Sequence, residues 1–340
     1  MMGYPKVRKG TGVMRRWTLG LLIALVLAGP AAAAPFQPCV VYTEAGKFDK
    51  SFNEMAYAGV TAFQAGGGAA VKEFEPSSPA DYVPRMEAAV QAGCSDIVVI
   101  GFRFAEDLAT VAPRHPSVHF SIIDGVVEGT NVASILFAEN EGAYLAGVAA
   151  ALASQTGHLG FIGGMPVPVI RRFQAGFTQG VRDTRPDARV SVAMLSDSPK
   201  GFADPFAGSE AARDLLASGV DVVFPAAGAS GLGALDAMSA AGRLGIGVDS
   251  NQDYLYPGHI LTSMVKRLDR AVKTIFETGA AGGFRPGLTR LGLREGGVDV
   301  TITPYNRTLW TADVEAAVKK AREDILAGRI KVGDETAVPS

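Results

Sequence analysis

The chain has 340 residues, 48% of them hydrophobic and 19% charged, and its 32 basic and 34 acidic residues give a formal net charge of −2 at pH 7. The first 34 residues hold five of the basic residues and no acidic ones, so the remainder carries a net charge of about −7. That balance gives no reason to expect nucleic acid or an anionic membrane surface as a partner.

Residues 1–34 have the layout of a cleaved secretory signal peptide. A basic segment precedes an apolar run at 19–28, and the small residues at 31–34 offer a cleavage site. The apolar run is shorter than the roughly 20 residues that span a bilayer, which disfavours a membrane anchor. We expect cleavage near Ala34. The basic segment contains Lys6, Arg8, Lys9, Arg15 and Arg16.

Two details of the leader leave alternatives open. The pair Arg15-Arg16 is compatible with a twin-arginine export signal, although Trp17-Thr18 after it matches that signal poorly. Translation starts at Met1 or at Met14, and the second start would leave a shorter leader.

The only cysteines are Cys39, at the start of the first expected strand, and Cys94, just before the strand at 96–100. In a doubly wound sheet these strands can be neighbours, so a disulfide is geometrically possible in an oxidising compartment. Two buried thiols are the alternative, and the sequence does not decide between them. No lipobox precedes Cys39, so a lipid anchor is not expected.

Beyond the leader, strand patterns alternate with helical patterns, which predicts βαβ units and parallel sheets. The strands read as continuous apolar runs, typical of sheets covered on both faces. The pattern restarts near residue 157, so we expect two similar lobes with a cleft between them. Strands are expected at 39–42, 97–100, 119–123, 159–162, 190–195, 222–226, 246–248 and 260–264. Helices are expected at 53–65, 79–92, 105–112, 139–154, 167–183, 206–218, 231–241, 267–277 and within 310–332.

The usual sources of catalytic power are missing from the sequence. Its four histidines are scattered and lie at no metal-ligand spacing, and neither a G-x-S-x-G elbow nor a phosphate-binding loop occurs. The glycine-rich segment GASGLG at 228–233 has the wrong spacing for a dinucleotide fingerprint, and close approach of its backbone to a ligand is the better interpretation. We therefore expect no catalytic residues, no metal and no cofactor.

The most informative motif is DKSFNE at 49–54, which follows the first strand. Phe52 can stack on a ring, while Asp49, Ser51 and Asn53 can supply hydrogen bonds. Asp49 or Ser51 could instead cap the helix that starts near residue 53. The motif lies at a strand-to-helix turn, where open α/β sheets bind ligands.

Further polar or aromatic residues follow the carboxyl ends of other expected strands, in both halves of the chain. For any single residue, a helix cap or a solvated charge is the simpler interpretation. Their recurrence at the same edge of successive βα units favours a shared ligand site. These residues are Asp124, Phe202, Asp204, Gly228, Asp249 and Lys266.

In one order along nearly the whole mature chain, several motifs resemble those of the basic membrane protein family. These are DKSFNE, IIDG, GFIGGM, GFADP, AAGASGLG, GVDSNQ and SMVKR. The family consists of substrate-binding proteins of ABC transporters and is similar to purine nucleoside receptors. Many members are tethered through an N-terminal cysteine, whereas this chain lacks a lipobox and is expected to diffuse freely in a periplasm.

The resemblance implies a type I periplasmic-binding fold, with two Rossmann-like lobes and a nucleoside closed between them. The first lobe would comprise 36–138 and about 260–290, and the second 139–259 and about 291–335. The resemblance also implies a monomer that binds a purine nucleoside and delivers it to an ABC permease.

By motif position, Phe52 and Phe202 would sandwich the purine, and Asn53 and Asp124 would contact its polar edges. Three further residues would hold the ribose: Asp249 and Lys266 through their side chains, and Gly228 through its backbone. A receptor or sensor of the same fold for another small heterocycle, and a nucleoside-processing enzyme, are the alternative functions.

Overall fold

The computed structural model describes residues 1–6, 9–10 and 35–334. The expected leader forms a separate unit, Met1–Ala34. Its apolar run and expected cleavage point lie outside the described residues. Across the described ranges, none of the helices has both the length and the apolar character needed to cross a bilayer.

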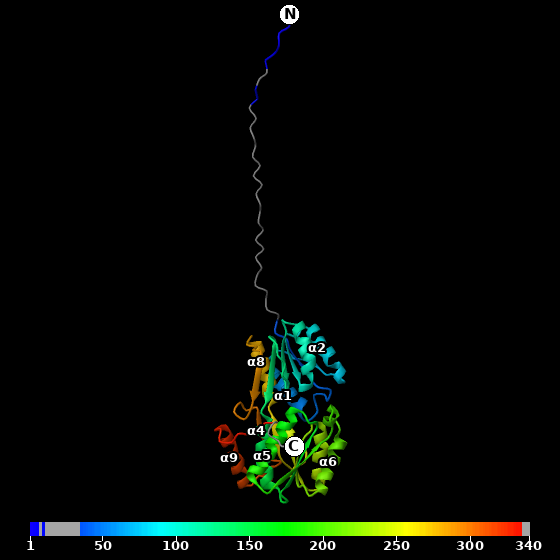
Figure 1. Cartoon of the computed structure of the whole chain (residues 1–340), viewed down its shortest axis with the longest axis vertical. Helices are drawn as coiled ribbons and strands as arrows, with labels where there is room; N and C mark the ends of the chain where they lie inside the picture. The colour runs from blue at the N-terminus through cyan, green and yellow to red at the C-terminus, as the bar shows by residue number, and fades with distance from the viewer. Residues whose placement is uncertain (7–8, 11–34, 335–340) are drawn as a thin grey trace. The chain divides into compact units, whose positions relative to one another are not determined.

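Residues 35–334 form two six-stranded sheets, each covered by helices (Figure 1). The first sheet has the order β11-β5-β4-β3-β1-β2, and all its pairs are parallel. The second has the order β12-β10-β9-β8-β6-β7, and only the β10–β12 pair is antiparallel. The predicted architecture of two Rossmann-like lobes is confirmed.

The strands of the first sheet are β1 (Pro38–Val41), β2 (Lys72–Phe74), β3 (Asp96–Ile100), β4 (His119–Ile123), β5 (Val132–Phe137) and β11 (Gly287–Leu291). Those of the second are β6 (His158–Gly163), β7 (Arg189–Met194), β8 (Val222–Ala226), β9 (Leu244–Asp249), β10 (Ile260–Lys266) and β12 (Val298–Val300). The helices are α1 (Phe52–Ala65), α2 (Tyr82–Gln91), α3 (Ala105–Val111), α4 (Glu139–Ala153), α5 (Pro168–Thr184), α6 (Pro205–Ala217), α7 (Ala229–Ala240), α8 (Leu268–Ala280) and α9 (Ala312–Leu326).

The central strands are largely apolar because both of their faces are buried. In the first sheet, Val40 and Val98 pack toward α1 and α8, whereas Cys39 and Ile97 pack toward α2 and α3. Successive side chains of a strand point to opposite faces, so a strand buried on both sides cannot show polar alternation.

Four strands were missed by the sequence pattern, and most of them lie at sheet edges. β2 is a three-residue edge strand with the sequence KEF, and β11 is a largely exposed edge strand. β12, the edge of the second sheet, has only three residues. Such edges carry little of the apolar signal that identifies central strands. β5 is well buried, and its absence from the prediction has no comparable explanation.

The chain crosses between the sheets after β5, after β10 and between β11 and β12. β10 is hydrogen-bonded to β9 in the second sheet, whereas the sequence-based division placed residues from about 260 in the first lobe. The crossover from the second sheet to the first follows Lys266. By sheet membership, we propose that 268–291 belongs to the first lobe and that the second lobe comprises 139–266 and 298–334.

Cys39 and Cys94 form a disulfide with a Cα–Cα distance of 5.9 Å. Parallel pairing of β1 with β3 brings the two residues together, since Cys39 pairs with Ile97 in the sheet and Cys94 lies just before β3. Of the two alternatives that the sequence left open, the structure shows the bonded one.

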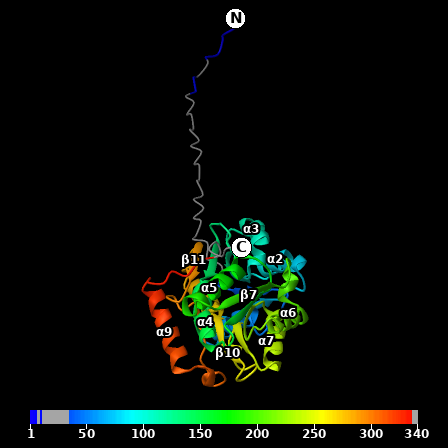
Figure 2. The same ribbon diagram turned by 60° about the horizontal axis from the view of Figure 1, so that its bottom comes forward.

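Helices α4 and α5 pack closely and set the geometry near the lobe junction, and α9 lies along α4 (Figure 2). A Cβ at Gly176 of α5 would lie 2.1 Å from the carbonyl oxygen of Asn140, so only glycine fits there. This close approach holds the first turns of α5 against the start of α4. Arg172 and Glu139 therefore come within ion-pair distance.

Candidate functional site

A cavity of about 180 Å³ lies between the lobes and is lined by residues of both. Seven of the nine predicted ligand-binding residues line it, and the other two, Ser51 and Asn53, do not. The chain therefore gathers strand-end residues from both halves at one place, as predicted. The seven are Asp49, Phe52, Asp124, Phe202, Gly228, Asp249 and Lys266.

Asp49 caps helix α1, which was one of the two interpretations of its role. One carboxylate oxygen accepts the backbone N–H groups of Ser51 (2.8 Å) and Glu54 (3.1 Å), and the other accepts that of Asn53 (2.9 Å). These bonds satisfy donors that a helix start leaves free. Asp49 both lines the cavity and fixes the loop that carries Phe52.

Asn53 is fully buried, and its amide is used within the protein. The side-chain nitrogen donates to the Thr43 hydroxyl (2.8 Å) and the Gly46 carbonyl (3.0 Å), and the oxygen accepts the Thr43 N–H (3.3 Å). Both amide hydrogens are therefore occupied, and nothing in this geometry supports contact with a base edge. The amide instead ties the loop at 43–46 to helix α1.

Several hydrogen bonds join the lobes next to the cavity. The Ser51 hydroxyl donates to Asp249 Oδ2 at 2.8 Å. The carbonyl oxygen of Lys50 accepts both the Ser250 hydroxyl (2.7 Å) and the Gln252 amide (2.9 Å). The DKSFNE loop of the first lobe is thus fastened to the segment after β9, and the cleft is closed in this structure.

Three residues around this junction have left-handed backbone conformations: Lys50, Asp124 and Asp249, with φ values of 57°, 64° and 62°. They are the only non-glycine residues with positive φ in the described part of the chain. Such conformations are unfavourable for most side chains and are concentrated at functional sites. Asp124 follows β4 of the first lobe and Asp249 ends β9 of the second, so the two aspartates occupy similar positions in the two lobes.

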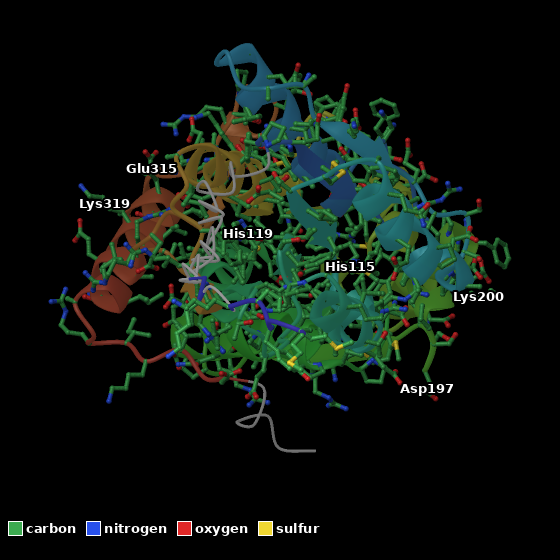
Figure 3. The ribbon with its side chains drawn as sticks, turned by 90° about the horizontal axis from the view of Figure 1, so that it is seen from above. His115, His119, Asp197, Lys200, Glu315 and Lys319 are labelled. Carbon is green, nitrogen blue, oxygen red and sulfur yellow. A yellow bond between two sulfur atoms is a disulfide. The ribbon has the colours of Figure 1, made fainter. Side chains whose placement is uncertain are left out.

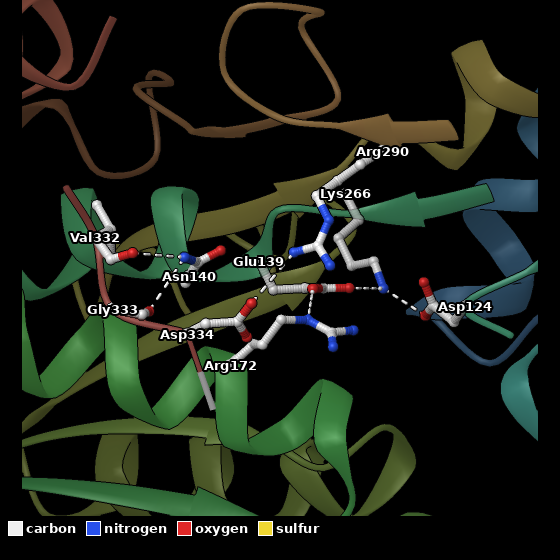
Figure 4. A network of polar contacts seen from close by, with 9 residues as sticks. All are labelled: Asp124, Glu139, Asn140, Arg172, Lys266, Arg290, Val332, Gly333 and Asp334. Atoms are coloured by element: carbon white, nitrogen blue, oxygen red, sulfur yellow. Dashed lines mark hydrogen bonds and ion pairs between the residues drawn. The ribbon is translucent and has the colours of Figure 1, made fainter. Parts of the chain in front are cut away.

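Asp124 and Lys266 line one wall of the cavity and belong to a buried cluster of charges that also includes Glu139 and Arg172 (Figure 4). The Lys266 ammonium pairs with Asp124 Oδ2 and lies 3.1 Å from Glu139 Oε1, and Glu139 Oε2 accepts Arg172 Nε at 2.7 Å. Asp124 Oδ1 is buried and has no hydrogen-bond partner among the described residues. Because Asp124 lines the cavity, this unpaired oxygen can accept a hydrogen bond from a ligand.

Burial sets the protonation of this cluster. Burial raises the pKa of Asp124 to about 6 and also raises the pKa of Asp249. In both cases the nearby charge of Lys266 acts in the opposite direction and lowers the pKa. Burial also disfavours the charged form of Lys266, but Asp124 and Glu139 outweigh this effect and raise the pKa of the lysine. The wall thus keeps a cation beside Asp124 and Asp249, two carboxyl groups whose pKa burial raises.

Aromatic rings from both lobes line the cavity. Phe52 and Phe102 belong to the first lobe, and Phe173 and Phe202 to the second. The Phe102 and Phe202 rings meet edge to face with centroids 6.5 Å apart. Lys266 Nζ lies 5.1 Å from the centre of the Phe52 ring. The cavity therefore combines aromatic surface with a buried charged wall.

Phe202 packs against two glycines that belong to motifs identified in the sequence. A Cβ at Gly164, within GFIGGM, would lie 2.5 Å from the Phe202 ring. Gly228 has a φ of 54° and lies against the backbone of Phe202. Close backbone approach at these two positions places the Phe202 ring at the cavity.

Sequence reasoning missed several cavity residues. Phe102 comes two residues after the end of β3, and Thr43 and Glu44 come shortly after β1, so the strand-end rule could have found them. Glu44 accepts hydrogen bonds from Arg103 and from the Tyr82 hydroxyl. Phe173 lies within helix α5, where no local pattern distinguishes it from a core residue.

Two of the four histidines, His115 and His119, make separate contacts away from the cavity. His115 pairs with Glu87, and His119 lies beside Asp96 and stacks on Phe284. Figure 3 labels both side chains. Within the described residues, no group of three or more histidine, cysteine or acidic side chains is arranged to hold a metal ion.

Comparison with known proteins gives a consistent result. Residues 36–336 match the Bmp family, described as "ABC transporter substrate-binding protein PnrA-like". The chain is 33% identical over 310 residues to the "ABC transporter nucleoside-binding protein BmpA" of Lactococcus lactis, covering 84% of this chain and 86% of that protein. It is 31% identical over 300 residues to "Basic membrane protein A1" of Borrelia garinii, covering 83% and 85%.

A solved structure of an ABC transporter solute-binding protein from Aeropyrum pernix is also similar. It superposes with a TM-score of 0.79 at 29% sequence identity, and the match covers 87% of this chain and 93% of that one.

Proposed function

Because the chain belongs to the Bmp family of PnrA-like ABC transporter substrate-binding proteins, we propose that it is a periplasmic receptor that delivers purine nucleosides to an ABC importer. Family membership itself makes the protein the solute-binding component of an ABC transporter, with a small-molecule ligand and a permease as partners. The identity of the ligand and the roles of single residues are our proposal.

The observation that carries the proposal is the composition of the cavity between the lobes. Aromatic rings from both lobes line the same space as three aspartates and a buried lysine. A purine nucleoside has matching parts: a flat base that can stack, and a ribose whose hydroxyl groups can donate to carboxylates. The L. lactis relative, named a nucleoside-binding protein, supports this choice of ligand.

We assign stacking of the base to Phe52 and Phe202, and contacts with the ribose to Asp249, Lys266 and the backbone of Gly228. Asp124 offers its unpaired Oδ1 to a donor on the ligand. Ser51 is a positioning residue, because it orients Asp249, and Asp49 positions Phe52 by capping α1. The predicted role of Asn53 as a reader of the base is not retained.

Transport requires the lobes to open and close. The cavity of about 180 Å³ is smaller than most ligand pockets, so the cleft must widen to admit a nucleoside. A ligand that touches both lobes favours the closed form through its higher affinity for that form. The bonds from Ser51 to Asp249 and from the 250–252 segment to Lys50 would then form again around it.

Export to the periplasm is supported by two observations. The first 34 residues have the composition of a signal peptide, and the Cys39–Cys94 disulfide suits an oxidising compartment. We propose a freely diffusing monomer without a lipid tether. Sequencing the N-terminus of the protein recovered from a periplasmic fraction tests this, and a mature chain that still contains residues 1–34 would contradict it.

The decisive experiment is native mass spectrometry of the protein isolated from its own periplasm, followed by calorimetric titration of the emptied protein. Guanosine and inosine are expected to bind more tightly than guanine, hypoxanthine or ribose. A different heterocycle that co-purifies would support the alternative, a receptor of the same fold for another ligand. Incubation of the protein with inosine is expected to release no free base, and turnover would support a nucleoside-processing enzyme instead.

A further inference from the structure

A second cavity, of about 400 Å³, lies between helix α8 and the β4–β5–β11 part of the first sheet. It shares no lining residue with the cleft between the lobes. Its volume falls within the range of small-molecule pockets. We call it the α8 groove.

The α8 groove has an apolar interior. Ile135 of β5 and Leu291 of β11 contribute from the sheet, and Ile275 of α8 faces them. Phe284 also lines the groove, with its ring stacked on His119 at a centroid distance of 4.1 Å. Such walls suit the apolar body of a ligand.

A buried polar group also faces this space. Ser121 of β4 lines the groove and is 4% exposed. Its hydroxyl makes no hydrogen bond with any described residue and, although the residue is mostly buried, its oxygen is accessible to a ligand. A ligand acceptor or an ordered water would satisfy it.

The groove is also cationic. It is lined by Arg267, Arg270 and Arg285, and by one acid, Glu295. Arg267 forms a two-pronged ion pair with Asp269 (2.8 and 2.6 Å), whereas Arg270 and Arg285 have no acidic partner among the described residues. Glu295 accepts the Gly292 N–H through one of its oxygens.

The position of Arg270 strengthens this argument. It lies in the first turn of α8, where the helix dipole already contributes positive charge and a cation is unfavourable. Its guanidinium lies against Gly296, which also lines the groove. Two unpaired arginines at an apolar groove, in a chain whose net charge is negative, create a local field that favours anions.

We propose that the α8 groove is a second binding site, for a small organic anion with an apolar body. The apolar part lies between Ile135 and Ile275, and the carboxylate, sulfonate or phosphate group binds Arg270 and Arg285. Guanidinium groups bind such anions through charge-assisted hydrogen bonds. This proposal does not depend on the identity of the ligand in the cleft.

The test is calorimetric titration of the mature protein at low ionic strength with three probes: octanoate, octan-1-ol and acetate. Octanoate has both the charge and the apolar body, and each of the others lacks one. We expect octanoate to bind at least ten times more tightly than either. Octan-1-ol binding as tightly as octanoate, or no octanoate binding, would overturn the proposal.

Two pairs of variants locate the site. The double variant R270Q/R285Q removes the unpaired charges and is expected to weaken octanoate binding at least tenfold. Its control, R182Q/R243Q, removes two exposed arginines of the second lobe and should leave the affinity for octanoate unchanged. Thr274→Trp fills the groove from α8 and should abolish binding, whereas Glu277→Trp, exposed on the same helix but outside the groove, should not. If a groove variant and its control lost octanoate affinity equally, the α8 groove would not be the binding site.

Discussion

The Ser51 hydroxyl donates a hydrogen bond to Asp249 Oδ2 at 2.8 Å, joining residues that are 198 positions apart and belong to different lobes. Asp249 also lines the cavity and has a left-handed backbone. One bond therefore links closure of the cleft to the orientation of a carboxylate proposed to bind ligand.

Replacing Ser51 with alanine should weaken ligand binding without unfolding the protein. The variant leaves a buried carboxylate oxygen short of one donor in the closed form only, at a cost of about 1–2 kcal/mol. We expect the affinity for guanosine to fall about 5- to 30-fold by calorimetry. Ser117→Ala, at an exposed serine of the first lobe, is the control and should bind normally. Equal affinity of both variants would show that the bond does not contribute to closure.

Phe202→Ala should remove one face of the proposed aromatic clamp. Loss of a stacked ring is expected to cost about 2 kcal/mol, which corresponds to a roughly 30-fold weaker affinity for purine nucleosides. Phe206, an exposed phenylalanine at the start of α6 that does not line the cavity, provides a matched Phe→Ala control. If F202A and F206A bind guanosine alike, the base does not stack on Phe202.

Asp249→Asn should distinguish ribose recognition from base recognition. The amide keeps the size of the side chain but loses the charge that favours donors from ribose hydroxyls. We expect guanosine affinity to fall at least tenfold and guanine affinity to change less than threefold. Titrations of both compounds against both proteins provide the comparison. Equal losses of affinity for guanosine and guanine would show that Asp249 does not contact the ribose.

Much of the site could be predicted because open α/β sheets present ligand groups where their strands end. Asp124, Asp249 and Lys266 stand at such ends, and the structure brings them to one cavity. The same rule predicted Phe202 and Gly228. The disulfide remained undecided, because spacing alone does not reveal which strands are neighbours.

The rest of the site could not be predicted, because it depends on tertiary contacts between distant segments. Asn53 lies in the most informative motif, but its hydrogen bonds go to Thr43 and Gly46, which the sequence could not reveal. Phe173 of α5 lines the cavity, and Glu139 of α4 pairs with Lys266 behind it; both depend on the close packing of α4 against α5. The sequence also does not show that β10 pairs with β9 before the chain crosses to the other sheet, which is the basis of the lobe division proposed above.

Asp124 should make the stability of the protein depend on pH. Burial raises the pKa of its carboxyl group to about 6, compared with an ordinary value of 3.8, so the folded state holds the proton more tightly than the unfolded state. Between these two pH values the folded protein binds more protons, and its stability therefore falls as the pH rises. The wild type should lose up to about 3 kcal/mol relative to Asp124→Asn between pH 4 and pH 6, at 1.36 kcal/mol per pH unit, and no more above that range.

Urea unfolding of both proteins from pH 4 to pH 7.5 measures this difference, since carboxyl groups that do not interact with Asp124 contribute equally to both proteins. Asp197→Asn, at an exposed aspartate, is the control (Figure 3) and should follow the wild type at every pH. A constant difference between wild type and D124N over the whole range would mean that Asp124 ionises normally. The proposed ligand acceptor would then be mainly a carboxylate over the range of the experiment, because burial would not be holding its proton.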